Sequence, residues 1–188
     1  MSAHGRDLAY GGKVLGSIAA IVGIFIFSVN VAFASEITPE NIVSAVNKER
    51  EVRNIQPLKV NSKLQNAAGN KSTDMIVRNY FEHYAYSLTP WQFIANQNYD
   101  YSVAGENLAM GFSSSEGVVN AWINSPAHRA NLLNPEFEEI GVGVVKGEYV
   151  ENGNPTYTTM TTEMLAKPKP KISQILSAIS EKIINIFK

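Results

Sequence analysis

The stretch from residue 140 begins with Ile140-Gly141-Val142-Gly143-Val144-Val145, in which branched apolar residues alternate with small ones. Alternation with a period of two is typical of a β-strand, and glycines on one face let another layer approach closely. Asn152-Gly153 follows, a dipeptide strongly preferred in tight hairpin turns. Residues 157–162 are rich in threonine and supply a return strand. Residues 140–162 therefore predict an antiparallel hairpin.

The chain before this hairpin has the pattern of helices. Capping residues, prolines in a first turn and apolar residues at helical spacing predict helices over residues 38–53, from residue 61 to about residue 76, from residue 89, and from residue 114 or 115 to Ser125-Pro126. Gly69 lies inside the second helix, where a small residue would let another element approach closely. One more strand is expected around residues 106–110. Helices packed on a small antiparallel sheet define the α+β class.

Composition limits the kinds of protein that this chain can be. It has 188 residues, of which 45% are apolar, which is enough for one domain with extensions. The absence of cysteine excludes disulfides, zinc–thiolate sites and thiol nucleophiles.

The N-terminal segment, residues 1–34, has the pattern of a targeting sequence. Arg6 and Lys13 precede an apolar run over residues 14–34 that contains no charged residue. The run ends in Ala32-Phe33-Ala34, which matches a signal-peptidase site, yet it is also about long enough to span a bilayer. A cleaved signal peptide is favoured over an uncleaved membrane anchor. Either way, residues 36–188 are expected outside the cytoplasm, secreted or held at the outer face of the cytoplasmic membrane.

Charge is distributed unevenly along the rest of the chain. Residues 35–166 carry 9 Lys and Arg against 15 Asp and Glu, which argues against nucleic-acid binding. Residues 167–188 carry 5 Lys against 1 Glu, in a proline-rich basic linker followed by an amphipathic helix. This helix is expected to fold back on the domain, bind a partner or lie on a membrane surface.

Three further motifs precede the hairpin. They are Phe81-Glu82-His83, Gly105-Glu106-Asn107-Leu108-Ala109 and Ser125-Pro126-Ala127-His128-Arg129-Ala130-Asn131-Leu132-Leu133. In this order, together with the strand from residue 140, they make residues 42–165 resemble the CAP superfamily, also called the SCP or cysteine-rich secretory protein family, in its cysteine-free bacterial branch. The resemblance implies a CAP domain over residues 38–166, folded as a three-layer α-β-α sandwich.

The resemblance also implies a cleft lined by His83, Glu106 and His128. Two imidazoles and one carboxylate would favour Zn²⁺ over Mg²⁺ and leave coordination positions open. Many family members have a second glutamate a few residues after the tryptophan that corresponds to Trp122. Here that stretch reads Ile-Asn-Ser, which puts a two-carboxylate mechanism in doubt.

Binding and hydrolysis are both hypotheses for this cleft. As a binding module it would hold a lipid, glycan or peptide ligand, or a component of the cell envelope, and six aromatic residues between residues 84 and 101 suit such ligands. As a hydrolase it would use His83 or Glu106 as general base, with Ser125 or a metal-bound water as the attacking group. Structural roles compete with both hypotheses. Glu106 could cap backbone amides or pair with Arg129, and Arg129 could instead anchor a backbone carbonyl. Binding is the favoured hypothesis.

Overall fold

The computed structural model describes residues 36–170, 172, 175–176, 179–180 and 182–183. The chain divides into two units, residues 1–32 and 33–188, and the described residues all belong to the second. The predicted signal peptide or anchor lies outside the described residues. None of the helices among the described residues is long and apolar enough to cross a membrane.

The second unit contains the four helices predicted before the hairpin, the predicted hairpin and the strand predicted around residues 106–110, together with two elements that were not predicted. In chain order the elements are α1 (Pro39–Glu51), β1 (Lys59–Val60), α2 (Ser62–Val77), α3 (Pro90–Ala95), β2 (Tyr101–Met110), α4 (Ser115–Asn124), α5 (Pro126–Leu132), β3 (Glu139–Glu151) and β4 (Asn154–Pro168). The side chains of Thr38, Asn61, Thr89 and Ser114 each accept a backbone hydrogen bond at the start of a predicted helix. These bonds satisfy backbone amides that have no partner within the helix.

Ser125-Pro126 ends helix α4 as predicted, but a further helix, α5, which was not predicted, begins at the same dipeptide. Ser125 adopts an extended conformation, which ends α4 and at the same time precedes the first turn of α5. Proline is well tolerated in a first helical turn because the amide hydrogen that it lacks would have no helical partner there. The same dipeptide therefore ends one helix and begins the next.

The sheet has the strand order β1-β3-β4-β2. Strands β3 and β4 form the predicted antiparallel hairpin, with Asn152 and Gly153 in the left-handed region that its tight turn requires. Strand β2 pairs antiparallel with β4, but the two-residue strand β1 pairs parallel with β3, so the sheet is mixed rather than purely antiparallel. Pro168 pairs with Tyr101, so the sheet also includes the first two residues of the predicted linker.

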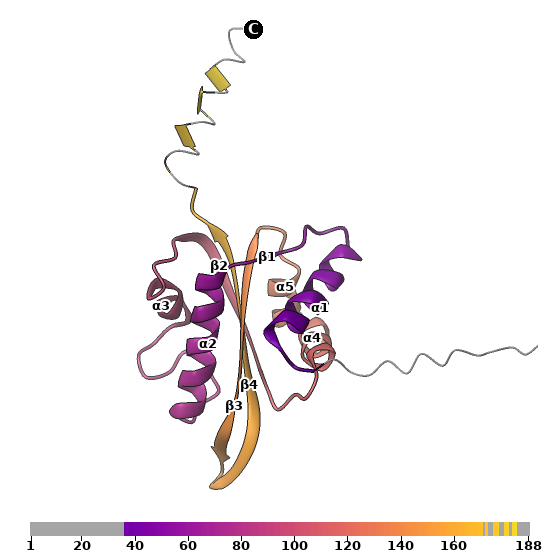
Figure 1. Cartoon of the computed structure of the whole chain (residues 1–188), viewed down its shortest axis with the longest axis vertical. Coiled ribbons are helices and arrows are strands. Elements are labelled where there is room, and N and C mark those ends of the chain that lie inside the picture. The colour runs from indigo at the N-terminus through magenta and orange to yellow at the C-terminus, as the bar shows by residue number, and fades with distance from the viewer. Residues whose placement is uncertain (1–35, 171, 173–174, 177–178, 181, 184–188) are drawn as a thin grey trace, which may run out of the picture. The chain divides into compact units, whose positions relative to one another are not determined.

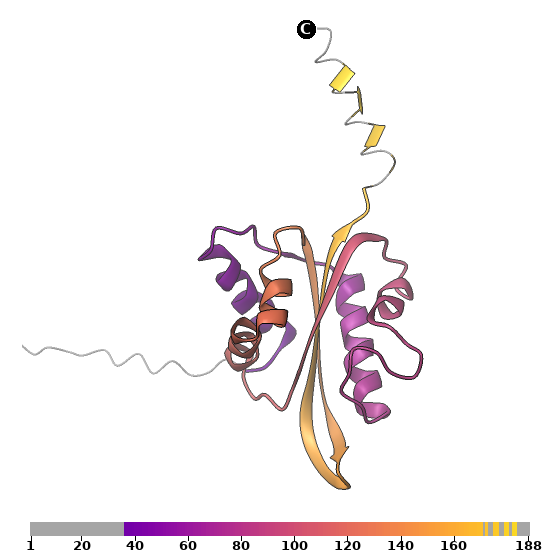
Figure 2. The same ribbon diagram turned by 180° about the vertical axis from the view of Figure 1, so that it is seen from behind.

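Helices cover both faces of this sheet, as the two opposite views show (Figures 1 and 2). Helices α2 and α3 lie on one face, and α1, α4 and α5 lie on the other. Each face has its own apolar core: Leu64, Ala68, Phe93, Ile94 and Met164 belong to the first, and Ile42, Val46, Trp122, Leu132 and Ile140 to the second. Two cores separated by one sheet make the predicted α-β-α sandwich.

Glycines of β3 allow α2 to pack directly on the strand. A Cβ atom on Gly141 would lie 2.1 Å from the backbone nitrogen of Gln65, and one on Gly143 would lie 2.4 Å from that of Gly69. Both distances are far below van der Waals contact. Strand β3 does approach α2 closely at Gly69, as predicted, but the small side chain of Gly69 is not the cause. A Cβ on Gly69 itself would meet no atom within 4 Å, so the small residues that the packing needs are those of the strand.

Substitution of Gly69 by alanine is therefore expected to stabilise the protein by about 1 kcal/mol, because alanine loses less conformational entropy in a helix. The free energy of unfolding in urea measures this effect. Gly143→Ala, one contact away, should instead destabilise the protein strongly, since its Cβ has no room. A destabilised Gly69→Ala variant would contradict the packing described here.

Candidate functional site

His83 and Glu106 form a close pair, with 2.6 Å between Nδ1 of the imidazole and Oε1 of the carboxylate. Glu106 extends from the edge strand β2, and its side chain is only 2% exposed. His83 lies on the loop between α2 and α3, and its side chain is 46% exposed. A buried carboxylate thus holds an imidazole that remains open to solvent.

The pair opens into a hollow of about 300 Å³ between α3 and strand β2. The residues that line it are His83, Tyr84, Pro90, Trp91, Ala104, Gly105, Glu106 and Asn131. We call this hollow the histidine pocket. Aromatic and small apolar side chains next to a few polar groups are usual for a small-ligand site.

Lys71 fixes the loop that carries His83. The residue is fully buried on α2, and its Nζ donates to the carbonyls of Glu82 at 2.8 Å and His83 at 3.1 Å, and to the Tyr80 hydroxyl at 3.3 Å. The ammonium also lies above the Tyr80 ring, 4.8 Å from its centroid. All three donors of the ammonium have acceptors, so Lys71 ties the backbone of the loop to the core.

Burial raises the pKa of Glu106, while the hydrogen bond from His83 and the charge of Lys71 oppose that shift. We interpret the pair as a carboxylate that accepts the Nδ1 hydrogen of His83, which leaves Nε2 with its lone pair. The other oxygen, Oε2 of Glu106, is buried and has no hydrogen-bond partner among the described residues. Arg129 does not pair with Glu106. It donates to the carbonyl of Ile123 at 3.2 Å, which is the alternative role expected for it.

His128 lies on α5, where it is half-buried. Burial, and to a lesser extent the neighbouring His83, lowers the pKa of its imidazole and favours the neutral form that binds metals. His128 is not among the residues that line the histidine pocket. Within the described part of the chain, no three His, Asp or Glu side chains are grouped so that they could hold a metal ion. The zinc site therefore stays a prediction.

A buried polar network lies on the opposite face of β2. Asn107 donates to Glu163 at 2.7 Å and to the carbonyl of His128 at 3.2 Å. Asn131 donates to the side chain of Asn107 and to the carbonyl of Glu106, both at 3.0 Å. The network thus fixes α5 and its His128 to the strand that carries Glu106. Asn107 and Asn131 therefore bond to backbone carbonyls of other elements and not to those of their own turns.

The structure supports a structural role for Ser125. Its backbone joins α4 to α5, and its side chain makes no capping hydrogen bond. Sequence reasoning missed Lys71 and Glu163 as residues near the site, although both occupy positions of a buried pattern. Lys71 follows Ala67 by four residues and precedes Met75 by four, and all three are buried on the same face of α2.

Residues 43–161 match the model of the CAP family, described as the cysteine-rich secretory protein family. The match covers well over half of the chain, so this chain belongs to the CAP family. The sandwich fold and the absence of cysteine agree with the bacterial branch recognised in the sequence.

Several known proteins are similar to this chain. The protein YkwD of Bacillus subtilis strain 168 is 40% identical over 116 residues, which are 61% of this chain and 43% of that protein. An extracellular protein of Bacillus anthracis with an SCP domain has a similar structure, with a TM-score of 0.59 and 28% identity over 69% of this chain and 40% of that one. An outer surface protein of Borrelia burgdorferi shares the fold, with a TM-score of 0.58 and 23% identity over 73% of this chain and 100% of that one. The chain spans less than half the length of the two relatives from Bacillus.

Proposed function

We propose that this chain is an extracytoplasmic binding module of the cell envelope or the secreted proteins, and that its ligand occupies the histidine pocket. The observation that carries the proposal is the buried Glu106 carboxylate, which orients an exposed His83 at the mouth of a pocket. The apolar N-terminal run and the extracellular or outer-surface relatives support the location.

We propose a modified form of the predicted arrangement, in which two imidazoles bind a divalent metal and Glu106 supports one of them. His83 would offer Nε2 and His128 a neutral imidazole, while Glu106 would hold the Nδ1 hydrogen of His83 instead of binding the metal itself. A metal-binding histidine commonly donates its other N–H to a carboxylate in this way. The imidazole pair favours Zn²⁺ over Mg²⁺. Bound zinc would supply a Lewis acid with open positions for a ligand.

Calorimetric titration with Zn²⁺ tests this arrangement. We expect dissociation constants on the order of micromolar for the wild type and no binding for His83→Ala or His128→Ala. Glu106→Gln should weaken binding by roughly 10–100-fold, because it changes the group that orients a ligand and not a ligand. Glu82→Gln, at an exposed neighbour of His83, is the matched control and should leave the affinity unchanged. Equal zinc affinity in the wild type and in the two histidine variants would refute the site.

A metal-assisted hydrolase that acts on peptides or envelope material is the second candidate function. The observation in its favour is again the His83–Glu106 pair, since a carboxylate that orients an imidazole is also the arrangement of a general base. Turnover that disappears in a folded His83→Ala variant would favour this function over binding alone.

We propose in addition that the C-terminal amphipathic helix lies on an anionic membrane surface. Its apolar residues Ile172, Ile175, Leu176, Ile179 and Ile183 are all between 44% and 76% exposed, and the lysines of the tail supply positive charge. An exposed apolar stripe beside cationic side chains is the usual pattern of an interfacial helix.

Vesicle co-sedimentation tests the role of this helix. The wild type should bind vesicles that contain phosphatidylglycerol, and a chain that ends at Pro170 should not. The truncated chain keeps the hydrogen bond from Lys169 to Asp100, so its domain should retain its stability. A truncated chain that partitions as well as the wild type would rule out the membrane role, and an additional loss of stability would indicate that the helix packs on the domain.

A further inference from the structure

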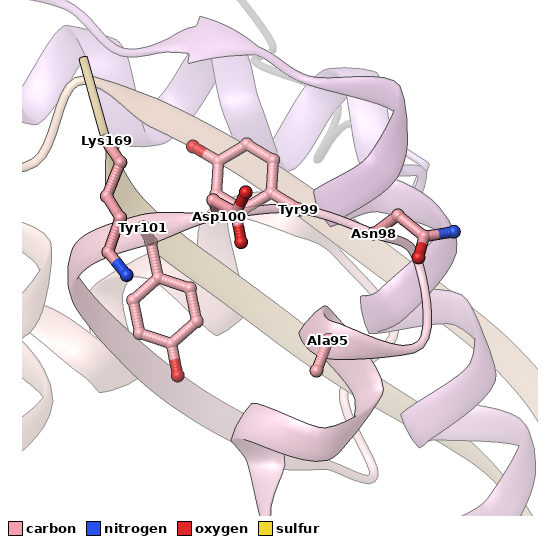
Figure 3. A pocket seen from close by; sticks show the side chains of 6 residues that line it. All are labelled: Ala95, Asn98, Tyr99, Asp100, Tyr101 and Lys169. Carbon is pink, nitrogen blue, oxygen red and sulfur yellow. The ribbon is translucent and has the colours of Figure 1, made fainter. Parts of the chain in front are cut away.

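A second hollow lies beside the histidine pocket, again between α3 and β2. Its volume is about 450 Å³, and it is lined by Ala95, Asn98, Tyr99, Asp100, Tyr101 and Lys169. Figure 3 shows Tyr101, Asp100 and Lys169 grouped on one side of the hollow, with Ala95 on the other and the Asn98 amide pointing outward. The histidine pocket borders the first residues of α3, whereas this hollow borders the last, so the two hollows follow the same helix.

An aromatic pair connects the two hollows. Trp91 lines the histidine pocket and Tyr101 lines the second hollow, and their ring centroids are 6.3 Å apart with an interplanar angle of 48°. Tyr84, which is 60% exposed, adds a third ring beside His83. From Tyr101 to Glu106 the strand advances by about 17 Å at its usual rise per residue. A ligand that touches both hollows must therefore be elongated.

The chemistry of this surface favours a sugar chain. Both hollows are open to solvent, and polar groups make up at least half of the lining of each, so neither encloses a hydrocarbon chain as a lipid site would. The exposed ring of Tyr84 and the half-buried rings of Trp91 and Tyr101 offer flat apolar faces, and the Asp100 carboxylate offers a partner for hydroxyl groups. Pro90 and Ala104 add a small apolar wall next to Trp91, which suits the methyl group of an acetamido substituent.

We infer that the two hollows form one elongated binding surface for an oligosaccharide of N-acetylated amino sugars, with Tyr84, Trp91 and Tyr101 as its aromatic contacts. This inference rests on the proposed binding function and names the class of ligand. A peptide added along the edge strand β2 is the competing occupant. The outward carbonyls of Glu106 and Leu108 already accept hydrogen bonds from Asn131 and Trp122, which leaves little of this edge for a peptide.

The fluorescence of Trp91 offers a direct readout. The chain has two tryptophans, and Trp122 is buried at 1% exposure, so a ligand in either hollow should affect Trp91 alone. The probes are the tetramer of N-acetylglucosamine, its monomer and tetraalanine. We expect a saturable change in Trp91 fluorescence with the tetramer, at least tenfold weaker binding of the monomer, and no binding of tetraalanine.

Tyr101→Ala should weaken binding of the tetramer by about fivefold to tenfold, the usual effect of one aromatic contact. Zinc binding should not change, because Tyr101 does not line the histidine pocket. Tyr157→Ala, which removes a ring that is 75% exposed on the hairpin, is the matched control and should bind the tetramer as the wild type does.

Failure of this inference is distinguishable from failure of the zinc site. A protein that binds zinc but shows no saturable response to the tetramer would overturn the sugar surface and leave the zinc site standing. A protein that binds the tetramer but no zinc would overturn the zinc site and leave the sugar surface standing. Equal affinities for monomer and tetramer, an unaffected Tyr101→Ala variant, or saturable binding of tetraalanine would each overturn the elongated sugar surface.

Discussion

Replacement of Arg50 by methionine is expected to lower the free energy of unfolding by about 3–5 kcal/mol, measured by urea denaturation. The guanidinium of this α1 residue is fully buried and donates to backbone carbonyls at the end of α5 and in the loops that follow α1 and α5. The acceptors are Gln56 at 2.9 Å, Leu132 at 2.8 Å, Asn134 at 3.0 Å and Phe137 at 3.3 Å. Methionine fills a similar volume but leaves all four carbonyls without this donor.

The same clamp fixes the end of α5, so the Arg50→Met variant should also show greater hydrogen exchange in the segment that follows His128. Arg53→Met is the matched control. Arg53 lies one turn further along, is partly exposed and pairs with Glu49 at the surface, so its loss should cost less than about 1 kcal/mol. Similar losses of stability in the two variants would contradict the role assigned to Arg50.

Replacement of Glu163 by glutamine is expected to stabilise the protein by up to about 3 kcal/mol at pH 8 and to have little effect at pH 4. Burial raises the pKa of Glu163 to about 7, although the hydrogen bond from Asn107 and the charge of Arg50 act in the opposite direction. The folded chain therefore binds a proton more tightly than the unfolded chain, whose glutamates titrate near 4.5. Each pKa unit of difference between the folded and the unfolded chain corresponds to about 1.4 kcal/mol of stability.

The sign follows from linkage between protonation and folding. A carboxyl group with a raised pKa in the folded state contributes its full stability below the unfolded pKa and loses it as the pH rises through the folded value. The wild type should thus lose stability between about pH 4.5 and pH 7. The Glu163→Gln variant should not show this loss, because its amide group does not ionise. Glu148→Gln, on the exposed end of the hairpin, should differ from the wild type by less than about 0.5 kcal/mol at both pH values. A Glu163→Gln variant that is less stable than the wild type at pH 8 would be evidence against a strained buried carboxylate.

Local chemistry made the helices and the hairpin predictable from sequence. Thr38 and Thr89 start helices because a hydroxyl followed by proline satisfies the first turn, and Asn152-Gly153 turns the chain because both residues tolerate positive φ. The parallel strand β1 was missed because two residues carry no periodicity and their partners are about 80 residues away. Pairing over such a distance depends on the finished sandwich.

The site was predictable only in part. Family resemblance pointed to His83, Glu106 and His128, and the structure brings the first two into contact. The resemblance could not tell whether Glu106 bonds to Arg129 or to His83, because the partner depends on which face of β2 the carboxylate occupies. Lys71 and Glu163 were overlooked because charged residues in helices and strands usually face solvent. Their buried positions follow from the apolar residues on the same face.

The tautomer of His83 decides whether the buried Glu106 carboxylate leaves Nε2 of this ring free to bind a metal. A long-range ¹H–¹⁵N spectrum of the imidazole, recorded near neutral pH, distinguishes a ring protonated at Nδ1 from one protonated at Nε2. We expect that His83 carries its hydrogen on Nδ1 in the wild type, that Glu106→Ala loses this preference, and that added Zn²⁺ shifts the Nε2 resonance. A wild-type ring protonated at Nε2, with Nδ1 as the acceptor, would rule out this arrangement of the site, because the buried carboxyl group would then be the donor and no nitrogen would remain for a metal.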